Sequence, residues 1–251
     1  MQSKTLGVLG GLGPLSGVYF CETLIRHTRA DRDQDHLNFL LSSHAETPDR
    51  TDFILGRSEE DPAKAMIEQV EALARAGADV IAIPCNTAHY FYDRISETAS
   101  VPVINIIQET VSFCKQQGIQ TVGVLATEGT VASGAYESVC ADQGVNYLTC
   151  TKEEQALITH IIYEQIKKGQ APDRASFDAV VKSLLGRGCE RVVLGCTELS
   201  LLKKLWCLSD PFIDSLEVLA CAAIRICGKE PIDFSSALMK FQPTKGTNLC
   251  C

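Results

Sequence analysis

Short apolar runs alternate along this chain with longer segments in which apolar and polar residues recur at helical spacing. An apolar run bounded by glycine, proline or polar residues is typical of a strand buried on both faces. The pattern predicts strands at 5–10, 37–42, 80–84, 102–105, 120–125, 146–149 and 190–195. It predicts helices at 15–27, 62–76, 88–97, 106–117, 152–168, 173–185 and 214–227, with another opening after the loop 126–130. Strands that alternate with helices indicate an α/β fold with largely parallel sheets.

The helix predicted from residue 62 shows how clear this pattern is. Asp61-Pro62 supplies a capping side chain and a proline for the first turn, and Gly77 ends the helix. An apolar stripe runs between them, consisting of Met66, Ile67, Val70, Leu73 and Ala74.

The two halves of the chain resemble each other. Thr5-Leu-Gly-Val-Leu9 matches Thr121-Val-Gly-Val-Leu125 at an offset of 116 residues, and Cys85 and Cys196 are offset by 111 residues. Each of these cysteines ends a predicted strand and is followed by capping residues and a predicted helix. The sequence therefore predicts two similar parallel-sheet lobes related by a pseudo-two-fold axis, each contributing one cysteine.

Composition limits the classes of function. A chain of 251 residues is long enough to bury a full core, and its net charge of −8 argues against nucleic acid or an anionic membrane as a partner. Apolar runs long enough to span a membrane are missing, and no signal-peptide core follows Met1. We therefore expect a cytoplasmic protein.

Twelve cysteines without an export signal are expected to be mostly reduced, buried thiols. Cys85 and Cys196 are exceptions because each lies at the carboxyl end of a strand and beside the positive end of a helix. That environment favours the thiolate. There is no Cys-x-x-Cys pair and no zinc-ligand spacing, so we expect no metal site.

Two other segments carry chemistry. The turn Gly10-Gly-Leu-Gly-Pro14 can present backbone N–H groups to an anion at a helix start, although its spacing is not that of a dinucleotide fingerprint. Arg50 lies in the loop after the second predicted strand, where open α/β sheets build their sites.

Five chemistries could use two such thiols. They are a redox disulfide, a metal site, nucleophilic catalysis by Cys85 with a base such as His89, ligand binding without catalysis, and stereoinversion. In stereoinversion one thiolate removes a proton from one face of a carbon and a thiol returns a proton to the other face. Two opposed groups of matched pKa, supplied by two similar lobes, suit that reaction.

At these residues the chain resembles the aspartate/glutamate racemase family, on its aspartate racemase branch. The resemblance covers the chain from about residue 5 to 228. The motifs that carry it are Ile83-Pro-Cys-Asn-Thr-Ala-His89, Leu194-Gly-Cys-Thr-Glu-Leu199, Gly10-Gly-Leu-Gly-Pro14, Asp33-Gln-Asp-His36, Pro48-Asp-Arg-Thr51 and Leu125-Ala-Thr-Glu-Gly-Thr130.

The resemblance implies a racemase that interconverts L- and D-aspartate without a cofactor, with Cys85 and Cys196 as the acid/base pair in a cleft between the lobes. It also implies a homodimer and a dicarboxylic amino acid as the small-molecule partner. Residues that would hold the α-carboxylate and the amino group are Asn86, Thr87, Thr127, Thr130 and Thr197. The side-chain carboxylate would lie on Arg50 and Lys167.

The same resemblance implies a division of the chain. The first lobe would comprise residues 1–103 and 208–228, with the last helix returning to it, and the second lobe residues 104–207. Residues 239–251 are expected to form a disordered tail. Glutamate or a broader range of amino acids, the related hydantoin racemases and maleate isomerases, and a two-lobed binding protein stay open as alternatives.

Overall fold

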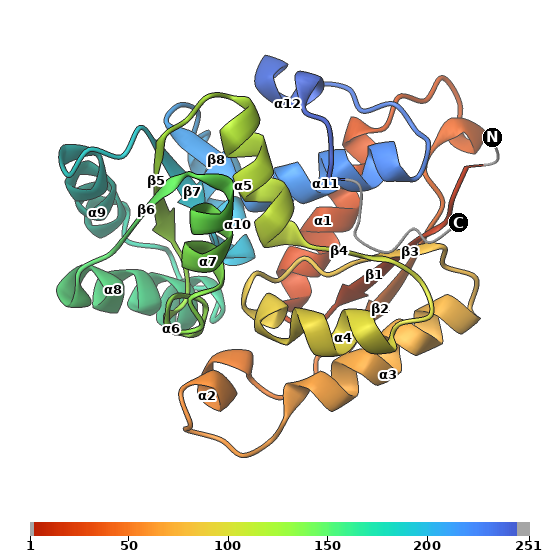
Figure 1. Ribbon diagram of the computed structural model, residues 1–251, viewed down its shortest axis with the longest axis horizontal. Helices are drawn as coiled ribbons and strands as arrows, with labels where there is room; N and C mark the ends of the chain where they lie inside the picture. The colour runs from red at the N-terminus through yellow and green to blue at the C-terminus, as the bar shows by residue number, and fades with distance from the viewer. Residues whose placement is uncertain (1–2, 245–251) are drawn as a thin grey trace.

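The computed structural model describes residues 3–244 and contains two four-stranded parallel sheets (Figure 1). The first sheet has the order β2-β1-β3-β4, from β1 (Leu6–Gly10), β2 (Phe39–Ser43), β3 (Val80–Ala82) and β4 (Val103–Ile104). The second has the order β6-β5-β7-β8, from β5 (Thr121–Leu125), β6 (Asn146–Thr149), β7 (Arg191–Leu194) and β8 (Phe212–Asp214). Within each sheet the chain visits the positions in the same sequence. The predicted fold class of two similar α/β lobes is therefore confirmed.

Register brings the predicted cysteines to equivalent places. Val8 pairs with Ala82 across β1 and β3, and Val124 pairs with Val193 across β5 and β7. Thus β3 and β7 occupy the same position in their sheets. The carboxyl ends of parallel strands lie at one edge of a sheet. Cys85, after β3, and Cys196, after β7, therefore lie at corresponding positions beyond the ends of equivalent strands.

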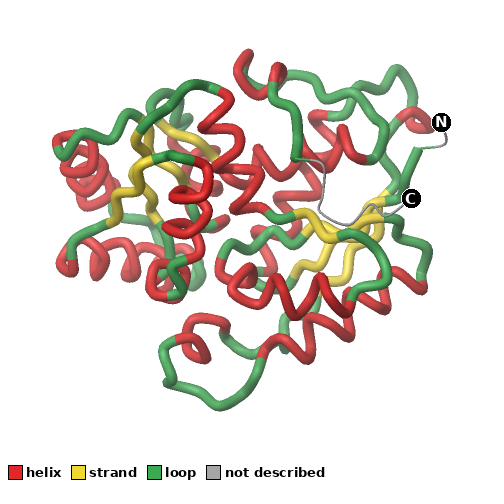
Figure 2. Tube along the Cα trace, viewed as in Figure 1, coloured by secondary structure: helices red, strands yellow, loops and turns green. Residues whose placement is uncertain are grey.

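Helices cover both faces of each sheet (Figure 2). The helices of the first half are α1 (Pro14–His27), α2 (Arg50–Ile54), α3 (Pro62–Arg75) and α4 (Tyr92–Thr98), with 3-10 turns η1 (Asp33–Asp35) and η2 (Thr87–Phe91). The second half contains α5 (Ile106–Gln116), α6 (Glu128–Ala132), α7 (Ala135–Gln143), α8 (Lys152–Thr159), the π-helix η3 (His160–Ile166), α9 (Arg174–Gly186) and α10 (Thr197–Trp206). They are followed by α11 (Ser215–Ile226) and α12 (Ser236–Lys240).

Helix starts are set by side chains that satisfy free N–H groups. Asn105 accepts hydrogen bonds from the first turn of α5, Asp61 from that of α3 and Asp214 from that of α11. Such caps are typically worth about 1 kcal/mol each. These capping residues explain why the predicted helix boundaries lie close to those observed.

The two lobes share one core. Helix α11 packs against both α5 and α1, and every residue from 218 to 224 is buried. A helix that is apolar on all sides must be enclosed on all sides. The main hydrophobic cluster accordingly joins Val8 of the first sheet to Val124 of the second through α5 and α11.

The predicted lobe boundary at residue 208 is wrong in one respect. Phe212–Asp214 forms β8 and pairs with β7 in the second sheet, so this segment belongs to the second lobe. The strand was missed because its apolar core is short and lies between Pro211 and the polar start of α11. The helix that follows does contact α1 of the first lobe, as the resemblance implied.

The predicted tail is also partly wrong. Met239 and Lys240 end α12, and Phe241 is buried with its ring edge against Phe113 of α5. Thr244 donates backbone and side-chain hydrogen bonds to Glu109. The buried ring and these hydrogen bonds hold the segment against α5, which composition alone did not reveal. Residues 245–251 of the predicted tail, including Cys250 and Cys251, lie outside the described residues.

Three local predictions differ from the structure. The loop around Arg50 contains the short helix α2, and the helix predicted at 88–97 begins as the 3-10 turn η2. The helix predicted at 152–168 changes into a π-helix from His160. Such π segments are uncommon and occur frequently at functional sites.

Candidate active site

Both predicted cysteines line one small, enclosed cavity between the lobes. Cys85 is 6% exposed and Cys196 is 5% exposed. The cavity volume is about 10 Å³, which corresponds to roughly one water molecule. Eight of the nine predicted site residues line it, namely Arg50, Cys85, Asn86, Thr87, Thr127, Lys167, Cys196 and Thr197. The ninth, Thr130, lies directly behind Thr87 and Thr127.

Three hydroxyl groups from the two lobes meet beside Cys85. The Oγ1 atoms of Thr87 and Thr127 lie 2.9 Å apart, those of Thr87 and Thr130 lie 2.9 Å apart, and those of Thr127 and Thr130 lie 3.0 Å apart. Thr87 comes from the first lobe, whereas the other two come from the start of α6. Each hydroxyl can donate only one hydrogen bond but can accept two. The triangle therefore retains free acceptor capacity for an ammonium group.

Asn86 is held more firmly than its sequence position indicated. Its Oδ1 accepts a hydrogen bond from Tyr136 at 2.8 Å, and its Nδ2 donates to Ser215 Oγ at 3.0 Å. Ser215 in turn donates to the carbonyl of Leu194, the last residue of β7. This series of hydrogen bonds connects the turn that carries Cys85 to the strand that leads to Cys196.

Thr197 makes a second link between the two cysteine turns. Its hydroxyl donates to the carbonyl of Pro84 at 3.1 Å, and Pro84 immediately precedes Cys85. The side chains of Thr197 and Asn86 are therefore already hydrogen-bonded within the protein. Each keeps only part of its hydrogen-bonding capacity for a ligand.

His89 does not reach the cysteine thiol. One ring nitrogen bonds the carbonyl of Cys85 at 2.8 Å, and the other accepts from the backbone N–H of Ile106 at 3.2 Å. Burial lowers the pKa of His89, which keeps the ring neutral. Both ring nitrogens of His89 bond backbone atoms, so the ring supports the fold and is not positioned as a base for Cys85.

Cys196 has a carboxylate partner that the sequence reasoning did not include in the site. Its Sγ–H donates to Glu198 Oε2 at 3.0 Å, and Glu198 is itself buried. Burial, followed by the negative charge of Glu198, raises the pKa of Cys196 well above its usual range. The expectation that the helix start favours a Cys196 thiolate is therefore wrong, because desolvation and the neighbouring charge outweigh the helix dipole.

Two cations lie at the open side of this cavity. Arg50 is 7% exposed, and within residues 3–244 its guanidinium donates only to neutral oxygens, the carbonyls of Thr47, Pro48 and Leu12. Its Nε has no hydrogen-bond partner among the described residues. A buried cation without an anion is costly, so this geometry favours an anionic ligand.

Lys167 follows the π-helix, and its Nζ lies 4.1 Å from the centre of the Tyr163 ring. Tyr163 lines the same cavity and donates to Thr51 Oγ1 of α2 at 2.8 Å. Sequence reasoning missed Tyr163, although it lies four residues before Lys167 and so shares its side of a helix.

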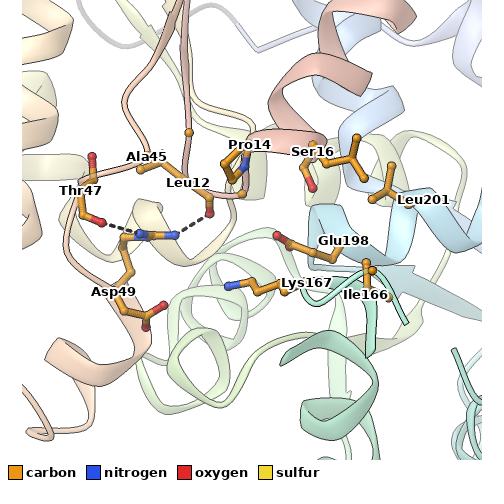
Figure 3. A pocket seen from close by; sticks show the side chains of 15 residues that line it. Leu12, Pro14, Ser16, Ala45, Thr47, Asp49, Ile166, Lys167, Glu198 and Leu201 are labelled. Atoms are coloured by element: carbon orange, nitrogen blue, oxygen red, sulfur yellow. Dashed lines mark hydrogen bonds between the residues drawn. The ribbon is translucent and has the colours of Figure 1, made fainter. Parts of the chain in front are cut away.

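A larger cavity adjoins the enclosed one. Its volume is about 520 Å³, and it shares Leu12, Asp49, Arg50, Lys167 and Glu198 with the inner cavity. Figure 3 shows the Lys167 ammonium and the Glu198 carboxylate pointing into the space across from Asp49 and Leu12. The outer cavity therefore offers a route toward the cysteines.

Within residues 3–244, side chains of histidine, cysteine, aspartate or glutamate do not gather in threes as a metal site would require. In the same range no helix is long and apolar enough to cross a membrane.

Comparison with known proteins places this geometry in a family. The sequence model of the Asp/Glu/hydantoin racemase family matches residues 9–223. The chain belongs to the Asp/Glu/hydantoin racemase family.

Individual relatives match over most of their length. The broad-specificity amino-acid racemase RacX of Bacillus subtilis strain 168 is 27% identical over 223 residues, which cover 87% of this chain and 96% of RacX. The aspartate racemase of Picrophilus torridus superposes with a TM-score of 0.79 at 30% identity, covering 91% of this chain and 96% of that one. An aspartate racemase homologue from Pyrococcus horikoshii OT3 has a TM-score of 0.72 at 26% identity, covering 89% and 99%.

Proposed function

We propose that this family member racemises aspartate without a cofactor, using Cys85 and Cys196 as two bases. The observation that carries the proposal is the enclosed cavity into which equivalent strands of two similar lobes deliver one thiol each. Racemisation needs a proton acceptor on one face of the α-carbon and a proton donor on the other. A pseudo-symmetric pair of thiols suits that requirement.

In one direction, the Cys85 thiolate removes the α-proton and the Cys196 thiol donates its proton to the opposite face. The products are the other enantiomer, a Cys85 thiol and a Cys196 thiolate. The raised pKa of Cys196 supports its role as the proton donor in this direction. The burial of both thiols strengthens each of these electrostatic interactions.

Glu198 gives Cys196 a way to act in the other direction. For Cys196 to remove a proton, its own proton must first leave, and the Glu198 carboxylate is already within hydrogen-bond distance of the thiol. A proton moved from Sγ to Oε2 leaves a thiolate beside a neutral carboxylic acid. The pair therefore holds one proton that either atom can carry.

The cations support a substrate with two carboxylates. Arg50 and Lys167 come from opposite lobes and both line the outer cavity of about 520 Å³, which has room for an aspartate that bridges them. Arg50 offers a planar fork for a carboxylate, and Lys167 offers a point charge. The free acceptor capacity of the hydroxyl triangle around Thr87 supports binding of the substrate's ammonium group there.

A broader substrate range is the second candidate function. The outer cavity carries the apolar side chains of Leu15, Ile166 and Leu201, which would suit amino acids with longer apolar side chains. The relative RacX is named as a broad-specificity racemase, at 27% identity. Aspartate and a panel of apolar amino acids distinguish the two candidates.

The decisive experiment is α-proton exchange in deuterated water, without pyridoxal phosphate. Incubating L-aspartate with the protein should yield α-deuterated L- and D-aspartate, followed by NMR and chiral chromatography. The same assay across the other amino acids defines the range. Binding without deuterium uptake for every amino acid would instead favour a binding protein.

Variants of the cysteines test the two-base chemistry itself. Cys85→Ala and Cys196→Ala should each abolish racemisation, because one face of the carbon then lacks its proton carrier. Exchange at the remaining thiol should return deuterium to the same enantiomer. Racemisation at a near-native rate by either variant would contradict the two-base proposal, and Cys207→Ala, at an exposed position, is the matched control.

A further inference from the structure

The glycine-rich turn after β1 has a feature that its backbone does not explain. Gly13 is the N-cap of α1 and has φ −168° and ψ 111°, an extended conformation that any residue adopts. Glycine is therefore not needed at this position for the backbone. Its missing side chain must matter for what lies against it.

Glu198 occupies that space. A Cβ atom on Gly13 would lie 2.2 Å from Glu198 Oε1 and 3.3 Å from its Cδ. The other oxygen of the same carboxylate, Oε2, accepts the hydrogen bond from Cys196 Sγ. One oxygen of Glu198 thus lies over Gly13 while the other holds the thiol.

We propose that Gly13 is a positioning residue for Cys196, because the space left by its missing side chain lets the Glu198 carboxylate reach the thiol. This inference rests on the proposed racemase function for its catalytic consequence. Its structural consequence, the contact between Glu198 and Cys196, does not depend on that function.

An alanine at position 13 would force the carboxylate aside. A contact of 2.2 Å is far shorter than real carbon–oxygen contacts, and the backbone of Gly13 can accept a methyl group without strain. The flexible end of Glu198 is the part that moves. Gly13→Ala therefore removes the thiol's partner while every atom of Glu198 and Cys196 remains present.

The first readout is alkylation of Cys196 by iodoacetamide as a function of pH, followed by peptide mass spectrometry. Moving a negative charge away from a thiol lowers the pKa of that thiol, and a like charge at this range typically shifts it by roughly one pH unit or more. The midpoint for Cys196 should therefore fall by roughly one pH unit in Gly13→Ala. The other charged groups around the cavity, Lys167, Arg50 and Asp49, are unchanged in this comparison.

The second readout is α-proton exchange in single-cysteine variants. In Cys85→Ala, which retains Cys196, adding Gly13→Ala should slow exchange roughly tenfold, the lower end for loss of a hydrogen bond to a charged group. The reason is that losing the carboxylate that takes the thiol proton outweighs the lower pKa of the thiol. In Cys196→Ala, which retains Cys85, it should change exchange less than about twofold. A general loss of folding would slow both equally.

Glu198→Ala completes a double-mutant cycle. If Gly13→Ala acts by displacing the carboxylate, it should have no further effect on the alkylation midpoint once Glu198 is truncated. Gly186→Ala is the matched control, since a methyl group there meets nothing within 4 Å and the residue is exposed. It should leave both readouts unchanged.

The outcomes separate the two proposals. An unchanged Cys196 midpoint in Gly13→Ala, or a full shift that persists in Glu198→Ala, would overturn the role of Gly13. A shifted midpoint with no exchange of any amino acid by the native protein would retain the role of Gly13 and reject the racemase function.

Discussion

We expect Arg50 to determine the preference for substrates that carry a side-chain carboxylate. Replacing it by alanine removes a guanidinium that is 7% exposed and whose acceptors are all neutral carbonyls. A charge-assisted hydrogen bond to such a group is worth about 1.5–3 kcal/mol, or roughly 10- to 150-fold in kcat/KM. We expect Arg50→Ala to lower kcat/KM for aspartate by at least this factor.

Arg50 also stabilises the fold, and the experiment must separate this contribution from substrate binding. Alanine leaves the buried carbonyls of Leu12 and Thr47 without their donor, so the melting temperature should fall as well. Arg50→Lys keeps a cation but loses the planar fork, and it should recover only part of the aspartate activity. Arg57→Ala is the matched control, because Arg57 is exposed on the same segment and pairs with Glu128 at the surface.

The assay compares kcat/KM for aspartate with kcat/KM for alanine and serine in each variant, wherever these react. A carboxylate pocket predicts a large loss for aspartate and a much smaller loss for uncharged substrates. Equal losses for both would refute the reasoning, since they would show that Arg50 serves only the fold or the α-carboxylate common to all amino acids.

Two further predictions concern the scaffold. Tyr136→Phe keeps the buried ring but removes the hydroxyl that donates to Asn86 Oδ1, so kcat for aspartate should fall about tenfold with little change in KM. The control is Tyr90→Phe, at an exposed ring. A lowered melting temperature with unchanged kcat in Tyr136→Phe would contradict a positioning role. Burial raises the pKa of Glu109 from 4.5 to about 7, so the stability that its protonated form contributes is present below pH 4.5 and is lost as the pH rises through 7. Glu109→Gln should therefore weaken the fall in melting temperature between about pH 5 and pH 8, measured by calorimetry, and an unaltered pH dependence would exclude Glu109 as its source.

The sequence by itself determined the fold class and located the two cysteines of the candidate site. Apolar runs bounded by turn residues located seven of the eight strands within residues 3–244. The signal is clearest for inner strands such as β1, which is buried along its whole length and is therefore apolar. The repeated arrangement of strand, cysteine and small polar residues located Cys85 and Cys196 at equivalent strand ends. The predicted capping was wrong, because neither Asn86 before η2 nor Cys196 before α10 makes a side-chain cap hydrogen bond. These features are local, and local patterns are what a sequence displays directly.

Local pattern was insufficient where a residue's environment comes from distant parts of the chain. Phe241 looked like part of a tail, yet its ring is fully buried in the main hydrophobic cluster and packs against Phe113. Asn86 looked free to bind a ligand, yet Tyr136 and Ser215, 50 and 129 residues away, take up much of its amide.

Only the tertiary structure decided the protonation of the second thiol. The helix start after Cys196 is visible in the sequence and favours a thiolate. Burial by both lobes and the carboxylate of Glu198 depend on how the chain packs, and Glu198 fits only because Gly13, 185 residues away, has no side chain. Desolvation and charge act through space rather than along the chain, so the sequence could locate this thiol but could not fix its pKa.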